Sequence, residues 1–250
     1  MRIMKKSIIC LVALVALTLG FTSCEKESAG LTQITYFAEI VLEGDATMVV
    51  AKGSEFVDPG FTATMKGEDV TDKVEVNSNV DTSTSGVYSV VYSIVNADGF
   101  PASATRTVIV LDVTDPIEGF WKVDVANSSR IYKAGAPTSY KGAFEFLIIK
   151  EDDGSYFVED LMAGWYAQGA GYGSNYAMQA YIDIAVDGTI SLLDSYVPGW
   201  GDAADDLKNA TYDASTDNIS YELYYGGVDE ETGTQVIIFN VSVNKVDLGL

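Results

Sequence analysis

The sequence predicts an all-β protein in which two domains follow an N-terminal leader. The first observation is that most of the chain beyond residue 33 consists of short runs of β-branched and aromatic residues, many of them alternating with polar ones. Alternation with a period of two is typical of half-buried strands. The second is that Asp-Gly pairs and similar turn sequences separate these runs, as they do in β-hairpins. The third is that the second half of the chain shows no amphipathic-helix repeat.

The leader occupies residues 1–23 and has the order of a secretory signal peptide. Positive residues open it, residues 8–20 are apolar, and small residues lead up to Cys24. The apolar run is shorter than the about 20 residues that span a bilayer, so we expect cleavage rather than a transmembrane helix. A chance cysteine behind an ordinary signal peptide is the alternative to the interpretation that follows.

Cys24, directly after the small residues, resembles the lipobox cysteine of bacterial lipoproteins. The resemblance implies that the leader is cut before Cys24, that the thiol is diacylated and that the new N-terminus is acylated. Several acyl chains hold a protein durably on a membrane, whereas one binds only marginally. Residues 24–33 would then be a lipidated tether. The polar stretch 25–30 resembles the surface-export signal of lipoproteins from the Bacteroidota, which implies an outer-membrane anchor facing the cell exterior. A position on the periplasmic face of that membrane is the alternative.

The composition of the chain excludes several classes of function. Cys10 leaves with the leader, so Cys24 is the only cysteine of the mature chain and no disulfide framework is possible. Histidine is absent, which excludes Ser-His-Asp and Cys-His catalysis and histidine-ligated zinc. The formal net charge of −21 repels phosphate backbones, so we expect no nucleic-acid partner. We also expect no cofactor.

Residues 34–113 form the first predicted domain. Its longest strand covers 87–95, a run of β-branched and aromatic residues. The segment 96–99 follows as a hairpin turn, and its Asp-Gly pair tolerates positive φ. About 80 residues in some seven short strands are typical of an immunoglobulin-like sandwich. The other expected strands cover 34–37, 48–51, 74–76, 80–82 and 104–110.

Residues 50–63 of this domain closely resemble the opening of a bacterial immunoglobulin-like repeat, and three later segments match its second half in the right order. The resemblance implies a spacer or presentation module without catalytic residues. The same repeat occurs in extracellular adhesins, glycan-degrading enzymes and some insecticidal crystal toxins. Physically, the Asp-Pro-Gly sequence at 58–60 predicts a bend at a strand end, and we expect Phe56 and Phe61 in the core. The later segments are 86–92, 96–99 and 106–110.

A short linker, 114–116, separates the domains, because Pro116 stops the last strand of the first one. Residues 117–250 form a succession of hairpins, which favours an antiparallel meander that is closed or nearly closed. The Gly-Phe-Trp sequence at 119–121 resembles the start of lipocalin-like barrels, which implies a calycin-like β-barrel domain. A second β-sandwich is the alternative. The expected strands cover 119–125, 144–150, 155–158, 180–186, 189–193, 219–225 and 235–243.

The candidate ligand-binding residues are aromatic side chains on glycine-rich, weakly charged loops of the second domain. A ring offers a flat apolar platform for the C–H face of a sugar, while hydroxyl, Asp and Asn groups bind the sugar hydroxyls. The alternative is that these rings fill or cover the domain. We expect Trp121, Tyr181 and Tyr221 in the core, and a further aromatic patch lies at 221–225. The candidates are Trp165, Tyr166, Tyr172, Tyr176, Tyr196 and Trp200.

The carboxylate clusters do not predict a metal or catalytic site. The acidic groups at 152–153, 202–206 and 229–231 lack the spacing of a calcium loop. A glycosidase needs two carboxylates about 5 to 10 Å apart, but nothing local singles out one pair among 36 acidic residues. We therefore predict no catalytic residue and no metal ligand.

The order of the two domains resembles that of surface lipoproteins of gut Bacteroidota, which are often associated with polysaccharide uptake. We therefore expect a non-catalytic lipoprotein, anchored in the bacterial outer membrane through Cys24, whose second domain binds a glycan or a similar extracellular ligand. One alternative is an accessory, structural or adhesin-like lipoprotein that contacts a protein partner such as an outer-membrane transporter. Another is a carboxylate-dependent glycoside hydrolase.

Overall fold

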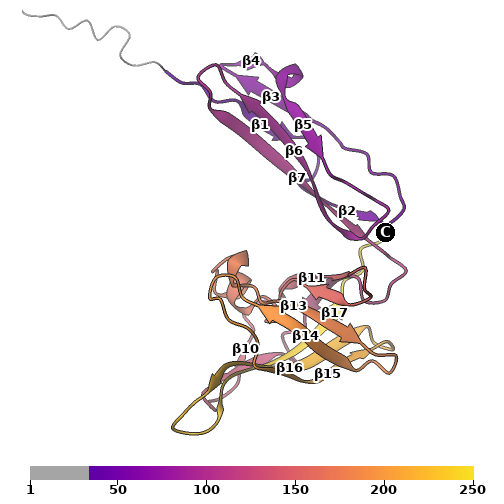
Figure 1. Cartoon of the computed structure of the whole chain (residues 1–250), viewed down its shortest axis with the longest axis vertical. Coiled ribbons are helices and arrows are strands. Elements are labelled where there is room, and N and C mark those ends of the chain that lie inside the picture. Colours follow the sequence, from indigo (N-terminus) through magenta and orange to yellow (C-terminus); the bar gives the residue numbers. More distant parts are fainter. Residues whose placement is uncertain (1–33) are drawn as a thin grey trace, which may run out of the picture.

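The computed structural model describes residues 34–250. The predicted leader 1–23, the predicted lipidation of Cys24 and the tether 24–33 lie outside the described residues. Two β domains follow one another along the chain, and the end of strand β7 (Pro101–Leu111) in the first domain lies next to the second domain (Figure 1). The all-β class predicted from the sequence is confirmed.

The first domain is the predicted immunoglobulin-like sandwich, built from two small sheets. In the larger sheet β6 pairs antiparallel with β5 and β7, and β2 pairs parallel with β7. Tyr92 and Val108 are buried between the sheets, and Phe56 and Phe61 pack against them as expected. The strand orders are β2-β7-β6-β5 and β1-β3-β4, with β1 (Glu39–Leu42), β2 (Thr47–Ala51), β3 (Phe61–Met65), β4 (Glu68–Asp69), β5 (Glu75–Ser78), β6 (Gly86–Val95) and the short helix η2 (Thr71–Lys73).

The bend at residues 58–60 is held by Arg106, whose side chain is completely buried. Arg106 Nη2 donates hydrogen bonds to the backbone oxygens of Glu43 at 2.7 Å and Gly60 at 2.9 Å. Its Nε lies 3.2 Å from Asp58 Oδ1, close enough for an ion pair but out of line for a hydrogen bond, and the hydroxyl of Tyr92 donates to the other oxygen of Asp58. Burial raises the pKa of Asp58, but the hydrogen bonds from Tyr92 and Gly60 and the charge of Arg106 outweigh it and hold that pKa below its usual value.

The second domain is one large antiparallel sheet that folds back around its own core. Strand β17 is long enough to pair with three others: β16 along its length, β9 near its start and β8 near its end. No helix among residues 34–250 is long and apolar enough to cross a membrane. The elements are β8 (Gly119–Val123), β9 (Ser129–Tyr132), β10 (Thr138–Ser139), β11 (Glu145–Lys150), β12 (Tyr156–Val158), the π-helix η3 (Trp165–Gly169), the 3-10 helix η4 (Ser174–Tyr176), β13 (Gln179–Ile184), β14 (Ile190–Tyr196), β15 (Asp206–Asp213), β16 (Asn218–Val228) and β17 (Gln235–Lys245).

The sheet does not close into a barrel. Starting from β8, the order runs β8-β11-β12-β13-β14 on one side and β8-β17-β16-β15 on the other. Between β14 and β15 the described residues make only an isolated bridge, Thr189–Thr211. A bulge interrupts β15 next to this bridge, and Asn209 within it has a φ of 50°. The domain is therefore a sandwich-like body with the strand order of a meander, and the closed calycin-like barrel implied by the sequence does not form.

The two domains share a small apolar cluster and a buried carboxylate. Ile109 and Leu111 of β7 pack with Leu147 and Ile149 of β11. Glu118 beside them is only 3% exposed. Its carboxylate accepts hydrogen bonds from the Ser85 hydroxyl at 2.9 Å, the Lys150 N–H at 3.0 Å and the N–H of Asp112. The joint around linker 114–116 is thus packed and hydrogen-bonded.

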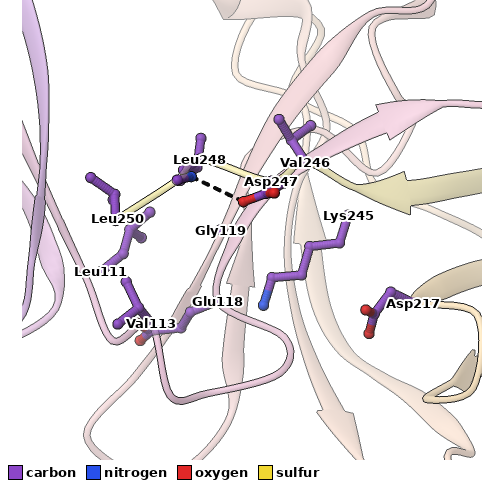
Figure 2. Close-up of a pocket in the computed structure, with 11 residues that line it drawn as sticks. Leu111, Val113, Glu118, Gly119, Asp217, Lys245, Val246, Asp247, Leu248 and Leu250 are labelled. Carbon is purple, nitrogen blue, oxygen red and sulfur yellow. Dashed lines mark hydrogen bonds between the residues drawn. The ribbon is translucent and has the colours of Figure 1, made fainter.

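A groove runs beside this joint. Figure 2 shows Leu111, Val113, Leu248 and Leu250 together on one side of it, and Lys245 and Asp217 on the other. Within the C-terminal segment the N–H of Gly249 donates to Asp247 Oδ1 at 3.0 Å, the dashed line in Figure 2. The chain's own last residues therefore make up much of the groove wall.

Candidate functional site

The loop between β12 and β13 is built around one buried carboxylate, Asp160, which is 2% exposed. Its Oδ1 accepts hydrogen bonds from the N–H groups of Met162 and Met178, both at 3.0 Å, and its Oδ2 accepts one from Gly164 at 2.9 Å. Burial raises the pKa of Asp160 from 3.8 to about 7, although the three N–H donors act in the opposite direction. Asp160 thus ties the start of the loop to its end.

The same loop turns at Gly164 because only glycine fits there. Gly164 has a φ of 79°, and a Cβ at this position would lie 2.5 Å from the Cβ of Phe144. The π-helix η3 begins at the next residue, and it closes with the Gly169 N–H donating to the Gly164 carbonyl at 2.8 Å. This turn brings Trp165 and Tyr166 to the domain surface near β9, β16 and β17.

A second loop, between β14 and β15, interlocks with the first. The N–H of Gly199 donates to the carbonyl of Asn175 at 2.6 Å. A Cβ on Gly199 would lie 2.6 Å from the ring of Tyr176, so the two loops meet without room for a side chain. The next residue, Trp200, then packs against Tyr176 with ring centroids 5.0 Å apart.

Five rings from the two loops and β16 form what we call the aromatic surface. Tyr166 lies edge-on to Trp200 at 4.8 Å and stacks on Tyr172 at 6.0 Å, and Tyr172 contacts Tyr176 at 5.4 Å. Trp200 also stacks on Tyr225 at 6.3 Å. Tyr172 and Trp200 remain 55% and 40% exposed, respectively. Sequence positions almost 60 residues apart, from Tyr166 to Tyr225, thus meet in one continuous set of rings.

Tyr225 is the buried end of the aromatic surface, and it is held by an acidic side chain. Its hydroxyl donates to Asp202 Oδ2 at 2.7 Å. Burial, together with the hydrogen bond to Asp202 and its negative charge, raises the pKa of Tyr225. The hydrogen bond fixes Asp202 behind the rings, so this carboxylate acts as a support for Tyr225.

Trp165 lies beneath the aromatic surface and supports it. Its ring is edge-on to Tyr140 at 4.8 Å and to Phe239 at 5.9 Å, and the Tyr140 hydroxyl donates to the carbonyl of Met162 at 3.0 Å. Phe239 also contacts Tyr166, at 6.1 Å. Trp165 therefore couples the loop to the core of the domain.

Arg130 of β9 completes the surroundings of the rings. Its guanidinium carbon lies 5.5 Å from the centroid of Trp165, 5.7 Å from Tyr166 and 5.2 Å from Tyr132, distances at which cation–π attraction operates. Arg130 and Tyr132 were not among the residues predicted from the sequence, because they lie on a strand with no glycine-rich context. The one available signal was that Arg130 is the only arginine in the second domain.

The structure separates the other aromatic residues singled out in the sequence. Tyr196 is half exposed but has no ring contact with the aromatic surface among the described residues. Trp121 and Tyr221 are buried, as expected. The expectation for Tyr181 was wrong: it is 41% exposed and packs on Phe157, because alternation along β13 turns its neighbours inward instead. Among residues 34–250, no group of three or more acidic, cysteine or histidine side chains is arranged to hold a metal ion.

Comparison with known proteins matches both domains. The bacterial surface protein Ig-like domain family matches residues 40–110, and the BT2262-like C-terminal domain family matches residues 110–240. The crystal structure of the lipoprotein BT2262 from Bacteroides thetaiotaomicron is 36% identical, with a TM-score of 0.68, over 84% of this chain and 100% of that chain. No curated protein matches.

Structures of Clostridium perfringens ZmpB match much more distantly. One contains CBM51-2 in complex with GlcNAc and INT domains, and another the M60 catalytic domain with CBM51-1 and CBM51-2. Both are 17% identical to this chain and cover 85% of it. The match covers 45% of the first structure's chain with a TM-score of 0.25, and 22% of the second structure's chain with a TM-score of 0.24. Scores this low give no information about the fold or the ligand of the present chain.

Proposed function

This chain belongs to the family of BT2262-like lipoproteins, and from that premise we propose that it is a non-catalytic surface lipoprotein whose second domain binds a glycan on the aromatic surface. Family membership supports a β-rich lipoprotein. The glycan ligand, the outer-membrane location and the absence of catalysis are parts of the proposal.

The observation that carries the proposal is the continuity and exposure of the aromatic surface. Large rings normally leave water when a domain folds, and contiguous exposed apolar patches mark interaction sites. Here Tyr172 and Trp200 keep about half of their surface in solvent while Tyr166, Tyr176 and Tyr225 hold them from behind. Rings that are held rigidly with one side open are suited to stacking against the C–H faces of sugars.

We infer that Cys24 carries the acyl chains and that the protein stands on the outer face of the outer membrane. The chain enters the first domain at the end remote from the second domain (Figure 1). The carbonyl of Tyr36 accepts a hydrogen bond there from Asn96 Nδ2 at 2.8 Å, and Asn96 lies at the β6–β7 turn, opposite the domain joint. The aromatic surface would therefore be displayed one domain length away from the anchored end.

Substitution of Trp200 tests the proposal. Trp200→Ala removes a ring that contacts four neighbours in the aromatic surface but is itself 40% exposed. We expect affinity for a retained polysaccharide to fall about tenfold or more, the equivalent of about 1.4 kcal/mol, while the melting temperature changes little. Affinity electrophoresis of the wild-type protein and the variant on a panel of polysaccharides measures this.

Tyr196→Ala is the matched control, because Tyr196 is an exposed aromatic residue outside the aromatic surface. Its affinity should equal that of the wild type. Equal loss in both variants, or no retention of the wild type by any polysaccharide, contradicts the proposal. Co-purification with an outer-membrane transporter, with no sugar raising the melting temperature, would support the protein-partner function instead.

A further inference from the structure

Arg130 is a cation without a counter-ion in a strongly acidic protein. The chain has 36 Asp and Glu residues against 15 Lys and Arg, and the other arginine of the described residues, Arg106, has an aspartate partner. No hydrogen bond or ion pair of Arg130 occurs among residues 34–250, and its buried Nε has no partner. A guanidinium has five N–H donors in a planar fork that matches a carboxylate or sulfate, and here the fork is unused.

The position of Arg130 connects this free fork to the aromatic surface. Its guanidinium lies against Trp165 and Tyr166, 5.5 and 5.7 Å from their centroids, and Tyr166 contacts both Tyr172 and Trp200. A ligand lying across the exposed rings would therefore bring its substituents to the Arg130 side. Stacking on rings also limits the motion of the guanidinium, so less side-chain entropy is lost when it binds.

Two lysines lie beside elements that carry the site. Lys133 follows β9 directly, 5.9 Å from the ring of Tyr132, and is paired with Asp229 at 3.2 Å. Lys141 is exposed, with its Nζ 3.5 Å from the carbonyl of Gly169 at the end of η3. On the other side of the rings Asp202 is occupied by the Tyr225 hydroxyl. Among the described residues, Arg130 is therefore the cation at the rings that no carboxylate pairs, and an anion would find its partner there although the whole chain repels one.

We propose that the aromatic surface binds an acidic glycan, with Arg130 holding a carboxylate or sulfate group of the sugar while the rings stack on its C–H faces. The inference deepens the proposed function and rests on it. Uronic acids, sialic acids and sulfated sugars share the required chemistry, which is an anionic group on a ring with an apolar face.

The backbone of the site argues against an extended peptide as the ligand. Peptides that bind along a protein main chain need free N–H and C=O groups. In the first loop the N–H groups of Gly169, Ala170, Tyr172 and Gly173 donate within the loop, at distances from 2.8 to 3.1 Å. Recognition therefore depends on side chains, and these are mainly flat rings and one guanidinium.

The experiment uses matched pairs of ligands with the two-domain protein. Each acidic oligosaccharide is measured by calorimetry beside its neutral counterpart: oligogalacturonate and its methyl ester, a sialylated and a desialylated glycan, a sulfated galactan and its desulfated form. We expect one acidic member to bind at least about tenfold more tightly than its neutral form, because a charge-assisted bidentate contact is lost in the latter. Added salt should lower the affinity for the acidic member and leave the affinity for the neutral member unchanged.

Arg130→Gln tests whether Arg130 is responsible for the preference for the acidic ligand. We expect it to abolish the preference for the acidic member while retaining the affinity for the neutral one, and Arg130→Lys to restore the preference only in part, because lysine lacks the planar fork. Lys73→Gln is the charge-matched control: it removes the same charge from η2 in the first domain, and the preference should stay intact. Because Arg130 also packs on Trp165, retained neutral binding and an unchanged melting temperature verify that the rings stay in place.

Two failures are distinguishable. Equal binding of acidic and neutral members, unaffected by Arg130→Gln but lost in Trp200→Ala, overturns the acidic specificity and leaves glycan binding intact. No binding by any member overturns both. Peptides with a free C-terminal carboxylate are measured beside their amidated forms, and selective binding of the free form without any glycan binding overturns the glycan class.

Discussion

Asp160 shows how a single buried side chain organises the loop that carries Tyr166, Tyr172 and Tyr176. Among residues 34–250 it has no cationic partner, and its carboxylate accepts hydrogen bonds from backbone N–H groups. Burying a carboxylate without a counter-ion disfavours its charged form, which is why its pKa rises to about 7. The protonation state of Asp160 is thus linked to the stability of the loop that presents Tyr166 and Tyr176.

The stability of the protein should depend on pH through Asp160. Because the pKa is 3.8 in the unfolded chain and about 7 in the folded one, the stabilisation is complete below about pH 4 and is lost as pH rises through 7. The loss can reach about 4 kcal/mol, since one pKa unit corresponds to about 1.36 kcal/mol. Urea unfolding between pH 4 and pH 8 measures the free energy of unfolding of the wild-type protein and of Asp160→Asn. The difference between the two proteins should change steadily as the pH rises through this range, because only the wild type loses the stabilisation. A pH-independent difference would contradict the linkage.

At the scale of elements, the site depends on two loops that pack without gaps between sandwich strands. A positive φ at Gly164 starts the π-helix η3, and the close approach of Gly199 to Tyr176 joins the loops. Loops of this kind are stable because their own backbone groups are hydrogen-bonded and their side chains cover the core. The rings are therefore positioned by backbone geometry as much as by ring–ring contact.

Two glycines of the same loop should respond very differently to substitution. Gly164 and Gly171 have similar φ values, 79° and 73°, but a Cβ on Gly164 would lie 2.5 Å from Phe144 whereas nothing lies within 4 Å of one on Gly171. Both alanine variants have the cost of a left-handed conformation, about 1 kcal/mol, and only Gly164→Ala adds a steric clash. We expect Gly164→Ala to lower the melting temperature much further and to weaken glycan binding. Equal effects of the two substitutions in thermal unfolding would show that the close contact is unimportant.

At the scale of the whole molecule, the joint between the domains decides how the aromatic surface is presented. Glu118 bridges Ser85 of the first domain to the N–H of Lys150 in the second, and the apolar contact of Leu111 with Leu147 lies beside it. A packed joint of this kind restricts the motion between domains that a short linker alone would allow.

Glu118→Ala should loosen the joint. The substitution leaves the partly buried N–H groups of Asp112 and Lys150 without this acceptor, at a cost of up to about 1–3 kcal/mol each. Small-angle X-ray scattering should then show a broader distribution of interdomain distances. Ser85→Ala is the control, because it removes one hydroxyl donor to Glu118 and leaves no backbone N–H group without its acceptor. If the scattering curves of Glu118→Ala and Ser85→Ala coincide, the carboxylate does not hold the domains together.

The strands were easier to predict from the sequence than the site. Alternation along β6, β7 and β16 is local and strong, and the turn pairs between strands mark where each one ends. The failure at Tyr181 has the same origin, since alternation says which residues share a face but not which face is buried. Sheet closure depends on how β14 meets β15, two strands separated by a loop whose path is set by packing. For that reason the sequence favoured a barrel and left the sandwich only as the alternative.

From composition and pattern alone followed the class of the protein: β-rich domains in a fixed order, a chemistry without histidine, and aromatic loops in the second domain. These are properties of composition and of short-range pattern. Only the tertiary structure decided which rings act together, placing Tyr225 of β16 with Trp200 and excluding Tyr196. It also placed Arg130 of β9 beside them. The reason is physical: contacts between residues far apart in the chain arise from the folding of the whole sheet, which no local pattern encodes.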